Sequence, residues 1–79
     1  MNAGIVEIDL HGKNKYQARV AIDAALRRSK GVYRIRLIHG FNKGTELREM
    51  ILEEYDARPN IIRLERTGEG STELVLREM

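Results

Sequence analysis

Apolar and charged side chains alternate in four short segments of this chain, and this alternation constrains the fold most strongly. The segments are residues 5–10, 33–38, 61–66 and 72–77. The apolar positions assigned to one sheet face are Val6, Ile8, Leu10, Tyr33, Ile35, Leu37, Leu64 and Leu74. The opposite face carries Glu7, Arg34, Arg36, Arg63, Glu65, Glu73 and Arg77. Such alternation indicates half-buried strands, whereas a sheet covered on both sides would read as continuously apolar. The sequence therefore predicts one sheet with helices on one face only.

Two helices are predicted between these strands. The first runs from about Lys15 to Ser29, because Asn14 and Gln17 have the spacing of a capping box. The second is predicted to be capped by Thr45, and Pro59 prevents it from continuing past Arg58. Residues 67–71 read as a hairpin loop between the last two strands. The predicted fold class is α/β, a two-layer sandwich in β-α-β-α-β-β order with a four-stranded mixed sheet.

The charges on the open face of the sheet predict a ladder of ion pairs. Arg34 and Arg36 are expected to pair with the carboxylates of Glu7, Glu65 and Glu73, because opposite charges directly across strands stabilise a sheet. The alternative is a platform for nucleic acid. No aromatic residue accompanies the two arginines, as base stacking would require, so the ladder is favoured.

Length and composition bound the class of protein. A chain of 79 residues with 42% hydrophobic and 33% charged residues predicts one globular domain over residues 1–79. It has no cysteine, no apolar run of about 20 residues, and no amino-terminal signal pattern. A cytoplasmic location and no membrane contact are therefore expected. The net charge of +2 is only a weak indication of a polyanionic partner.

Two histidine-glycine turns follow the first two strands, at His11-Gly12 and His39-Gly40. Each turn leads into a helix, whose first amides are unpaired and carry partial positive charge, so each can bind an anion such as phosphate. Basic residues gather in or just after these turns: Lys13, Lys15, Lys43 and Arg48. A crossover helix makes the first two strands parallel, so both end at one edge of the sheet. If the strands are neighbours, the two turns and Asp9 should lie together.

Other chemistries fit these residues less well. A metal site built from the two histidines and Asp9 lacks a fourth ligand with useful spacing, and lysines crowd it. A magnesium or manganese ion stays open as a cofactor. Residues 40–45 lack the Gly-Lys-Ser/Thr ending of a nucleotide-binding P-loop. Each histidine alone is equally well explained as a hydrogen-bonding turn residue, but two beside lysines favour a site.

Three motifs resemble the Smr (small MutS-related) domain family. They are Asp9-Leu10-His11-Gly12, residues 39–48 beginning His39-Gly40, and residues 67–70. The resemblance covers essentially the whole chain, as a stand-alone form of the domain. It implies a fold similar to the C-terminal domain of a bacterial translation initiation factor, with strand order 1-2-4-3 and an antiparallel fourth strand. It also implies nucleic-acid binding and, in many members, endonuclease activity on DNA or RNA.

The chain departs from the family pattern at two positions. Ile8 stands before Asp9 where leucine is usual, and Asn42 stands where the second motif usually has a glycine. A side chain at residue 42 hinders a close approach of the backbone to phosphate, and Lys43 can supply charge there instead.

These observations predict a nucleic-acid-binding endonuclease domain, with Asp9, His11 and His39 as catalytic residues. Phosphate contacts are predicted at Gly12, Lys13, Gly40, Asn42, Lys43, Gly44, Thr45 and Arg48. The alternative is a non-catalytic module that binds nucleic acid or a ribonucleoprotein through the same turns. A third possibility is an interaction domain that pairs through an edge strand. The expected partner is DNA or RNA, and the expected state is a monomer or weak homodimer.

Overall fold

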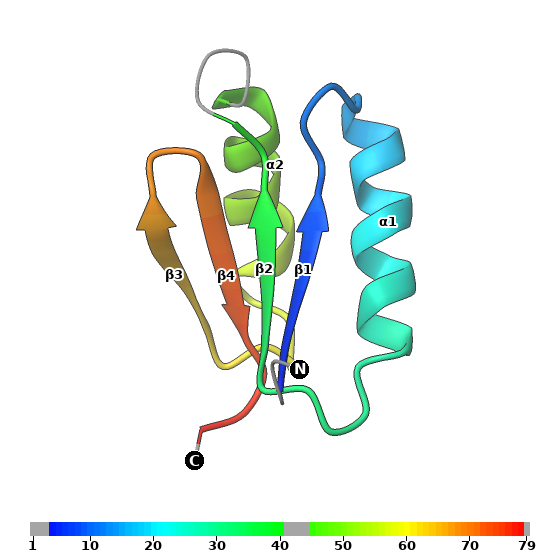
Figure 1. Ribbon diagram of the computed structural model, residues 1–79, viewed down its shortest axis with the longest axis vertical. Helices are drawn as coiled ribbons and strands as arrows, with labels where there is room; N and C mark the ends of the chain where they lie inside the picture. Colours follow the sequence, from blue (N-terminus) through cyan, green and yellow to red (C-terminus); the bar gives the residue numbers. More distant parts are fainter. Residues whose placement is uncertain (1–3, 41–44, 79) are drawn as a thin grey trace.

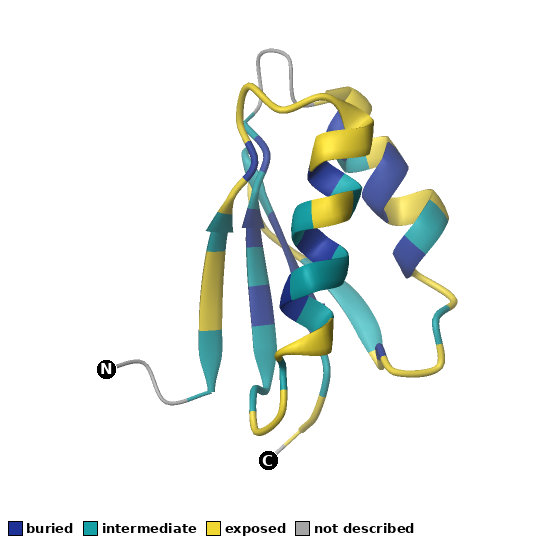
Figure 2. Ribbon diagram, turned by 90° about the vertical axis from the view of Figure 1, so that its right-hand side faces the viewer, coloured by how far each residue is buried: buried dark blue, intermediate teal, exposed yellow. Residues whose placement is uncertain are grey.

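The computed structural model describes residues 4–40 and 45–78. Its elements follow the predicted order (Figure 1), and they are β1 (Ile5–Asp9), α1 (Lys15–Arg27), β2 (Arg34–Ile38), α2 (Thr45–Tyr55), β3 (Arg63–Gly68) and β4 (Ser71–Val75). Both helices lie on the same side of the sheet (Figure 2), which confirms the two-layer α/β prediction. No helix in the described ranges is long and apolar enough to cross a membrane.

The sheet has the order β1-β2-β4-β3. β1 pairs in parallel with β2, and β4 runs antiparallel to both β2 and β3. This is the order implied by the family resemblance. The register places Asp9 opposite Ile38, so β1 and β2 end level with each other at one edge of the sheet.

The hydrophobic core lies between the sheet and the two helices. Its fully buried members include Leu10, Ile22, Ile35, Leu37, Ile51, Tyr55 and Leu74. Ile8 and Leu64 pack against this core but are only partly buried. The prediction that Val6 is buried is wrong, since 39% of this residue is exposed. Val6 lies opposite Ile35 on β2, but β1 is the edge strand and has no neighbour on its other side.

The first helix begins as predicted and ends slightly early. The Asn14 side chain accepts a hydrogen bond from the Gln17 amide at 2.8 Å, and the Gln17 side chain accepts one from the Asn14 amide at 3.0 Å. This capping box fixes the direction of α1 immediately after the first histidine turn. The helix ends at Arg27 rather than Ser29. Thr45 is the first residue of α2 and not its cap, contrary to the prediction.

Asn14→Ala is expected to lower the free energy of unfolding by about 1 kcal/mol, because the Gln17 amide loses its acceptor. Asn14→Asp keeps an acceptor at the same position and should remain close to wild type. Urea denaturation of both variants measures the difference. An equal loss in the aspartate variant would show that the capping hydrogen bond does not stabilise the helix.

The open face of the sheet carries the predicted ladder of ion pairs. Four carboxylates and three guanidinium groups alternate across all four strands, in the order Glu7, Arg36, Glu73, Arg34, Glu65, Arg63 and Glu78. Arg77 was predicted on this face, but it follows β4 and has no ion pair within the described residues. Glu78 was not predicted and ends the ladder beside Arg63.

Glu73 lies at the centre of this ladder and is only 3% exposed. It accepts hydrogen bonds from Arg34 Nη1 at 2.9 Å and from Arg36 Nε at 2.8 Å. Burial raises the pKa of Glu73, but these two hydrogen bonds outweigh it and leave the pKa below its usual value. The arginines of this face are thus already bound to carboxylates. A nucleic acid would have to break these pairs to use the arginines, which disfavours this face of the sheet as the binding site.

Candidate functional site

The two histidine turns lie side by side at the carboxyl edge of β1 and β2. The Leu10 amide donates a hydrogen bond to the Ile38 carbonyl oxygen at 2.7 Å, which continues the pairing of the strands up to the turns. A Cβ atom added to Gly40 would lie 3.9 Å from the Cβ of His11. The convergence predicted from the parallel strands is therefore confirmed. Asp9 is the last residue of β1 and His11 lies in the first turn, whereas His39 and Gly40 form the second turn.

The first turn presents His11 to solvent. The Lys13 amide donates to the Leu10 carbonyl oxygen at 3.0 Å, which closes a tight turn with His11 and Gly12 at its centre. Gly12 has a φ of +81°. A positive φ favours glycine at this position, because glycine has no Cβ atom. Asn14, the N-cap residue of α1, directly follows this turn, so His11 lies just before the amino terminus of the helix.

Asp9 holds the ring of His11 in one orientation. Its Oδ1 atom accepts a hydrogen bond from His11 Nδ1 at 2.7 Å and another from the His11 amide at 3.1 Å. An ionised carboxylate can only accept, so Nδ1 carries the hydrogen. These hydrogen bonds lower the pKa of the Asp9 carboxyl group below its usual value.

The His11 side chain is 74% exposed, and Nε2 has no partner among the residues that the structure describes. In the neutral ring this nitrogen bears the lone pair, and it can accept a proton from a bound molecule. The geometry is that of an oriented, solvent-accessible acid/base group.

His39 has a different environment. It is only 3% exposed, with Nδ1 2.8 Å from the Gly40 carbonyl oxygen and Nε2 3.0 Å from Oγ1 of Thr72. A carbonyl oxygen only accepts, so Nδ1 donates and the neutral ring accepts the Thr72 hydroxyl hydrogen at Nε2. The amides of His39 and Gly40 both donate to the Gly70 carbonyl oxygen, at 2.9 and 3.0 Å.

These hydrogen bonds connect His39, and with it the end of β2, to the β3–β4 hairpin. Both ring nitrogens are already engaged and the ring is inaccessible, so this geometry does not fit the catalytic role predicted for His39. It fits the turn-stabilising alternative instead. The sequence could not show this, because the partner threonine lies 33 positions later in the chain.

A shallow hollow of about 300 Å³ lies between the first turn and the start of α2. Its lining residues are Gly12, Lys13, Asn14, Lys15, Glu46 and Leu47. Gly12 and Lys13 were predicted as phosphate contacts. The others were not assigned, although their place in the first turns of the two helices is visible in the sequence. Two lysines make one side of the hollow basic, and Glu46 brings a carboxylate to the α2 side.

Three other predicted binding residues are described by the structure and do not line this hollow. Gly40, with a φ of +82°, turns the chain away from β2 beside His11. Thr45 is exposed at the start of α2, and Arg48 is partly buried on the same helix. The predicted contacts Asn42, Lys43 and Gly44 lie outside the described residues. Across residues 4–40 and 45–78, no three histidine, aspartate or glutamate side chains form a group that could hold a metal ion.

Comparisons with known proteins agree with this architecture. The family model of the Smr domain matches residues 8–77. The crystal structure of the Smr domain of Thermus thermophilus MutS2 superimposes with a TM-score of 0.79 at 30% sequence identity. The alignment covers 92% of this chain and 99% of that one. No curated protein sequence gave a match. On the strength of the family model and the structural match, this chain belongs to the Smr domain family.

Proposed function

We propose that this domain binds nucleic acid at the two histidine turns and cleaves a phosphodiester bond with the Asp9–His11 pair. The observation that carries the proposal is the exposed, oriented imidazole of His11, which directly precedes Gly12 and Lys13 in the lining of a hollow at the starts of two helices. Membership of the Smr family supports it, since that family is associated with nucleic-acid binding and nicking endonuclease activity.

The hollow offers phosphate two kinds of attraction. Lys13 and Lys15 supply full positive charges, and the amino terminus of α1 adds partial positive charge from its unpaired amides. The Glu46 carboxylate on the opposite side repels an anion. A phosphate is therefore expected on the Lys13–Lys15 side of the hollow, which is also the side next to His11.

His11 is the proton-transfer group of the proposed reaction. Nε2 takes the proton of an attacking hydroxyl group as the new P–O bond forms, or gives a proton to the leaving oxygen as the old P–O bond breaks. Asp9 orients the ring through Nδ1 and stabilises the imidazolium that forms. Because hydrogen bonds lower the pKa of Asp9, its carboxylate stays charged throughout the neutral range. His39 acts as a positioning residue that holds Gly40 against the first turn.

Non-catalytic binding of nucleic acid is the second candidate function. The burial of His39 favours it, because the described part of the site then offers one accessible histidine rather than an acid and a base. Binding requires only the lysines and the helix amides. Cleavage requires the Asp9–His11 pair as well, so variants of these two residues separate the candidates.

We expect Lys13→Ala and Lys15→Ala each to weaken the binding of nucleic acid by the same factor for every nucleotide sequence. Each lost phosphate contact should make the plot of log K against log salt shallower by about 0.7 to 0.9. Arg77→Ala is the matched control, because it removes one exposed positive charge after the end of β4, outside the lining of the hollow. Fluorescence anisotropy at several salt concentrations gives the slopes. If the lysine variants keep the wild-type slope, the hollow does not bind phosphate.

A further inference from the structure

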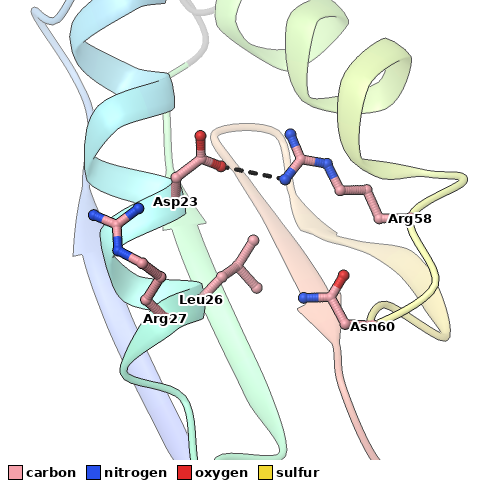
Figure 3. Close-up of a pocket in the computed structure, with 5 residues that line it drawn as sticks. All are labelled: Asp23, Leu26, Arg27, Arg58 and Asn60. Carbon is pink, nitrogen blue, oxygen red and sulfur yellow. Dashed lines mark hydrogen bonds and ion pairs between the residues drawn. The ribbon is translucent and has the colours of Figure 1, made fainter.

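A second cavity lies far from the histidine turns, between the C-terminal half of α1 and the segment that follows α2. It has a volume of about 440 Å³ and is lined by Asp23, Leu26, Arg27, Arg58 and Asn60 (Figure 3). The helix α1 begins at Lys15, which lines the hollow beside the first turn, and ends at Arg27, which lines this cavity. At a rise of 1.5 Å per residue the two sites are about 18 Å apart along the helix. The proposed cleavage mechanism makes no use of this cavity.

Arg58 is held in a fixed plane at the cavity. Its Cζ atom lies 4.3 Å from the centroid of the Tyr55 ring, so the guanidinium group stacks on a fully buried aromatic side chain. Nε donates to the Glu54 carbonyl oxygen at 3.2 Å, and Nη1 lies 3.4 Å from Oδ1 of Asp23. The Tyr55 hydroxyl group donates to the same Asp23 oxygen at 2.8 Å. Arg58 is thus preorganised, while Tyr55 itself is inaccessible.

A fixed guanidinium plane is a surface on which an unstacked nucleobase can lie. Tyr55 covers one face of the Arg58 guanidinium group, and Arg58 is one of the residues that line the cavity. Leu26 adds an apolar wall beside it. Figure 3 shows Leu26 reaching from α1 and Asn60 from the opposite segment toward the same space.

The polar groups of the cavity match a base better than an isolated phosphate. Asp23 contributes a carboxylate, which would repel a phosphate but can accept a hydrogen bond from the edge of a base. The Asn60 side chain can donate and accept, and it has no hydrogen-bond partner within the described residues. Arg27 is exposed at the rim and pairs with no acid in the part of the chain that the structure describes. Figure 3 shows its guanidinium group on the side of α1 away from Arg58 and Asn60, so it can meet the phosphate of a bound nucleoside only outside the cavity.

We propose that this cavity binds an unpaired nucleobase of the nucleic acid held at the histidine turns. The base stacks on Arg58 and contacts Leu26, its edge meets Asp23 and Asn60, and its phosphate meets Arg27. The proposal rests on the proposed nucleic-acid-binding function. A paired base offers neither a free face nor a free edge, so the domain prefers substrates with unpaired nucleotides.

Titration of the isotope-labelled domain with nucleoside 5′-monophosphates tests the base contact directly by NMR. The Asn60 side-chain amide and the backbone amides of residues 58 and 60–61 should shift with the nucleotides. Ribose 5-phosphate, which lacks a base, should leave them unchanged. Equal shifts with ribose 5-phosphate would show an anion site only, and no shift with any nucleotide would overturn the proposal. Signals of Gly12 and Lys13 report the histidine turns separately, so failure of one site is distinguishable from failure of the other.

Binding of the full domain to oligonucleotides gives the second test. Asn60→Ala should weaken binding to a single strand about fivefold, through loss of one hydrogen bond, and should not change binding to a fully paired duplex. Arg27→Ala should weaken single-strand binding more than the control Arg28→Ala, which removes the same charge at the next position, outside the cavity lining. Equal losses for single strand and duplex, or for Arg27→Ala and Arg28→Ala, would contradict a base-binding cavity.

Discussion

His11→Ala is expected to lower the rate of phosphodiester cleavage by about 10²- to 10⁴-fold, which is the usual contribution of a general acid–base group. The fold and the affinity for nucleic acid should stay nearly unchanged. The His11 side chain is 74% exposed, so its removal opens no cavity in the core. Exposed substitutions of this kind usually change the free energy of unfolding by less than about 0.5 kcal/mol.

Asp9→Asn is the companion variant. The amide oxygen can still accept hydrogen bonds, but the charge that stabilises the imidazolium is lost, so the rate should fall as well. Because the pKa of Asp9 is lowered by its hydrogen bonds to His11, the carboxylate is charged throughout the neutral range, and the deficit should persist across that range. Melting temperature, affinity and cleavage are measured on both variants. A loss of stability in proportion to the loss of cleavage would make Asp9 and His11 structural residues.

Glu73→Ala is expected to lower the free energy of unfolding by about 2 kcal/mol, through the loss of hydrogen bonds to two charged groups. The substitution leaves Arg34 and Arg36 without their central partner. Both arginines are about one-third exposed, so water compensates part of the loss. Glu7→Ala is the matched control at the rim of the ladder, where the pair is 3.5 Å long and exposed, and it should cost less than about 0.5 kcal/mol. Urea denaturation at pH 7 compares the two, and equal losses would contradict a central role for Glu73.

The same ladder makes stability depend on acid pH. Hydrogen bonds from Arg34 and Arg63 lower the pKa of Glu65, and the pKa of Glu73 is lowered as well. Carboxylates with a lowered folded-state pKa stabilise the fold above their unfolded pKa of about 4.3, and the stabilisation is lost as the pH falls through the folded value. The urea concentration at which half of the wild-type protein is unfolded should therefore decrease when the pH is lowered below about 4. Glu73→Gln, which has no charge to lose there, should show a shallower drop.

The fold could be predicted from the sequence because its main signals are local. Alternation in β1 and β2, the Asn14–Gln17 capping box, and Pro59 after α2 each depend on residues within a few positions of one another. The exposure of Val6 could not be predicted in this way. It depends on β1 being an edge strand, and strand order came from the family resemblance rather than from the alternation.

The candidate site shows the same division between local and distant contacts. Asp9 and His11 are two residues apart, so their hydrogen bond is a local contact between the end of β1 and the turn that follows it. The burial of His39 depends on Thr72 and Gly70 of the hairpin, and the fixation of Arg58 depends on Asp23, 35 positions away. Such long-range contacts leave no periodic pattern in the sequence, so the second cavity cannot be predicted from the sequence alone.

Incubation of the wild-type domain with end-labelled single- and double-stranded DNA and RNA, with and without magnesium or manganese, tests the central proposal most directly. We expect cleavage of at least one of these substrates, and loss of that cleavage in His11→Ala at unchanged affinity for the nucleic acid. A wild-type protein that binds these nucleic acids but cuts none of them under any metal condition would contradict the catalytic assignment of Asp9 and His11.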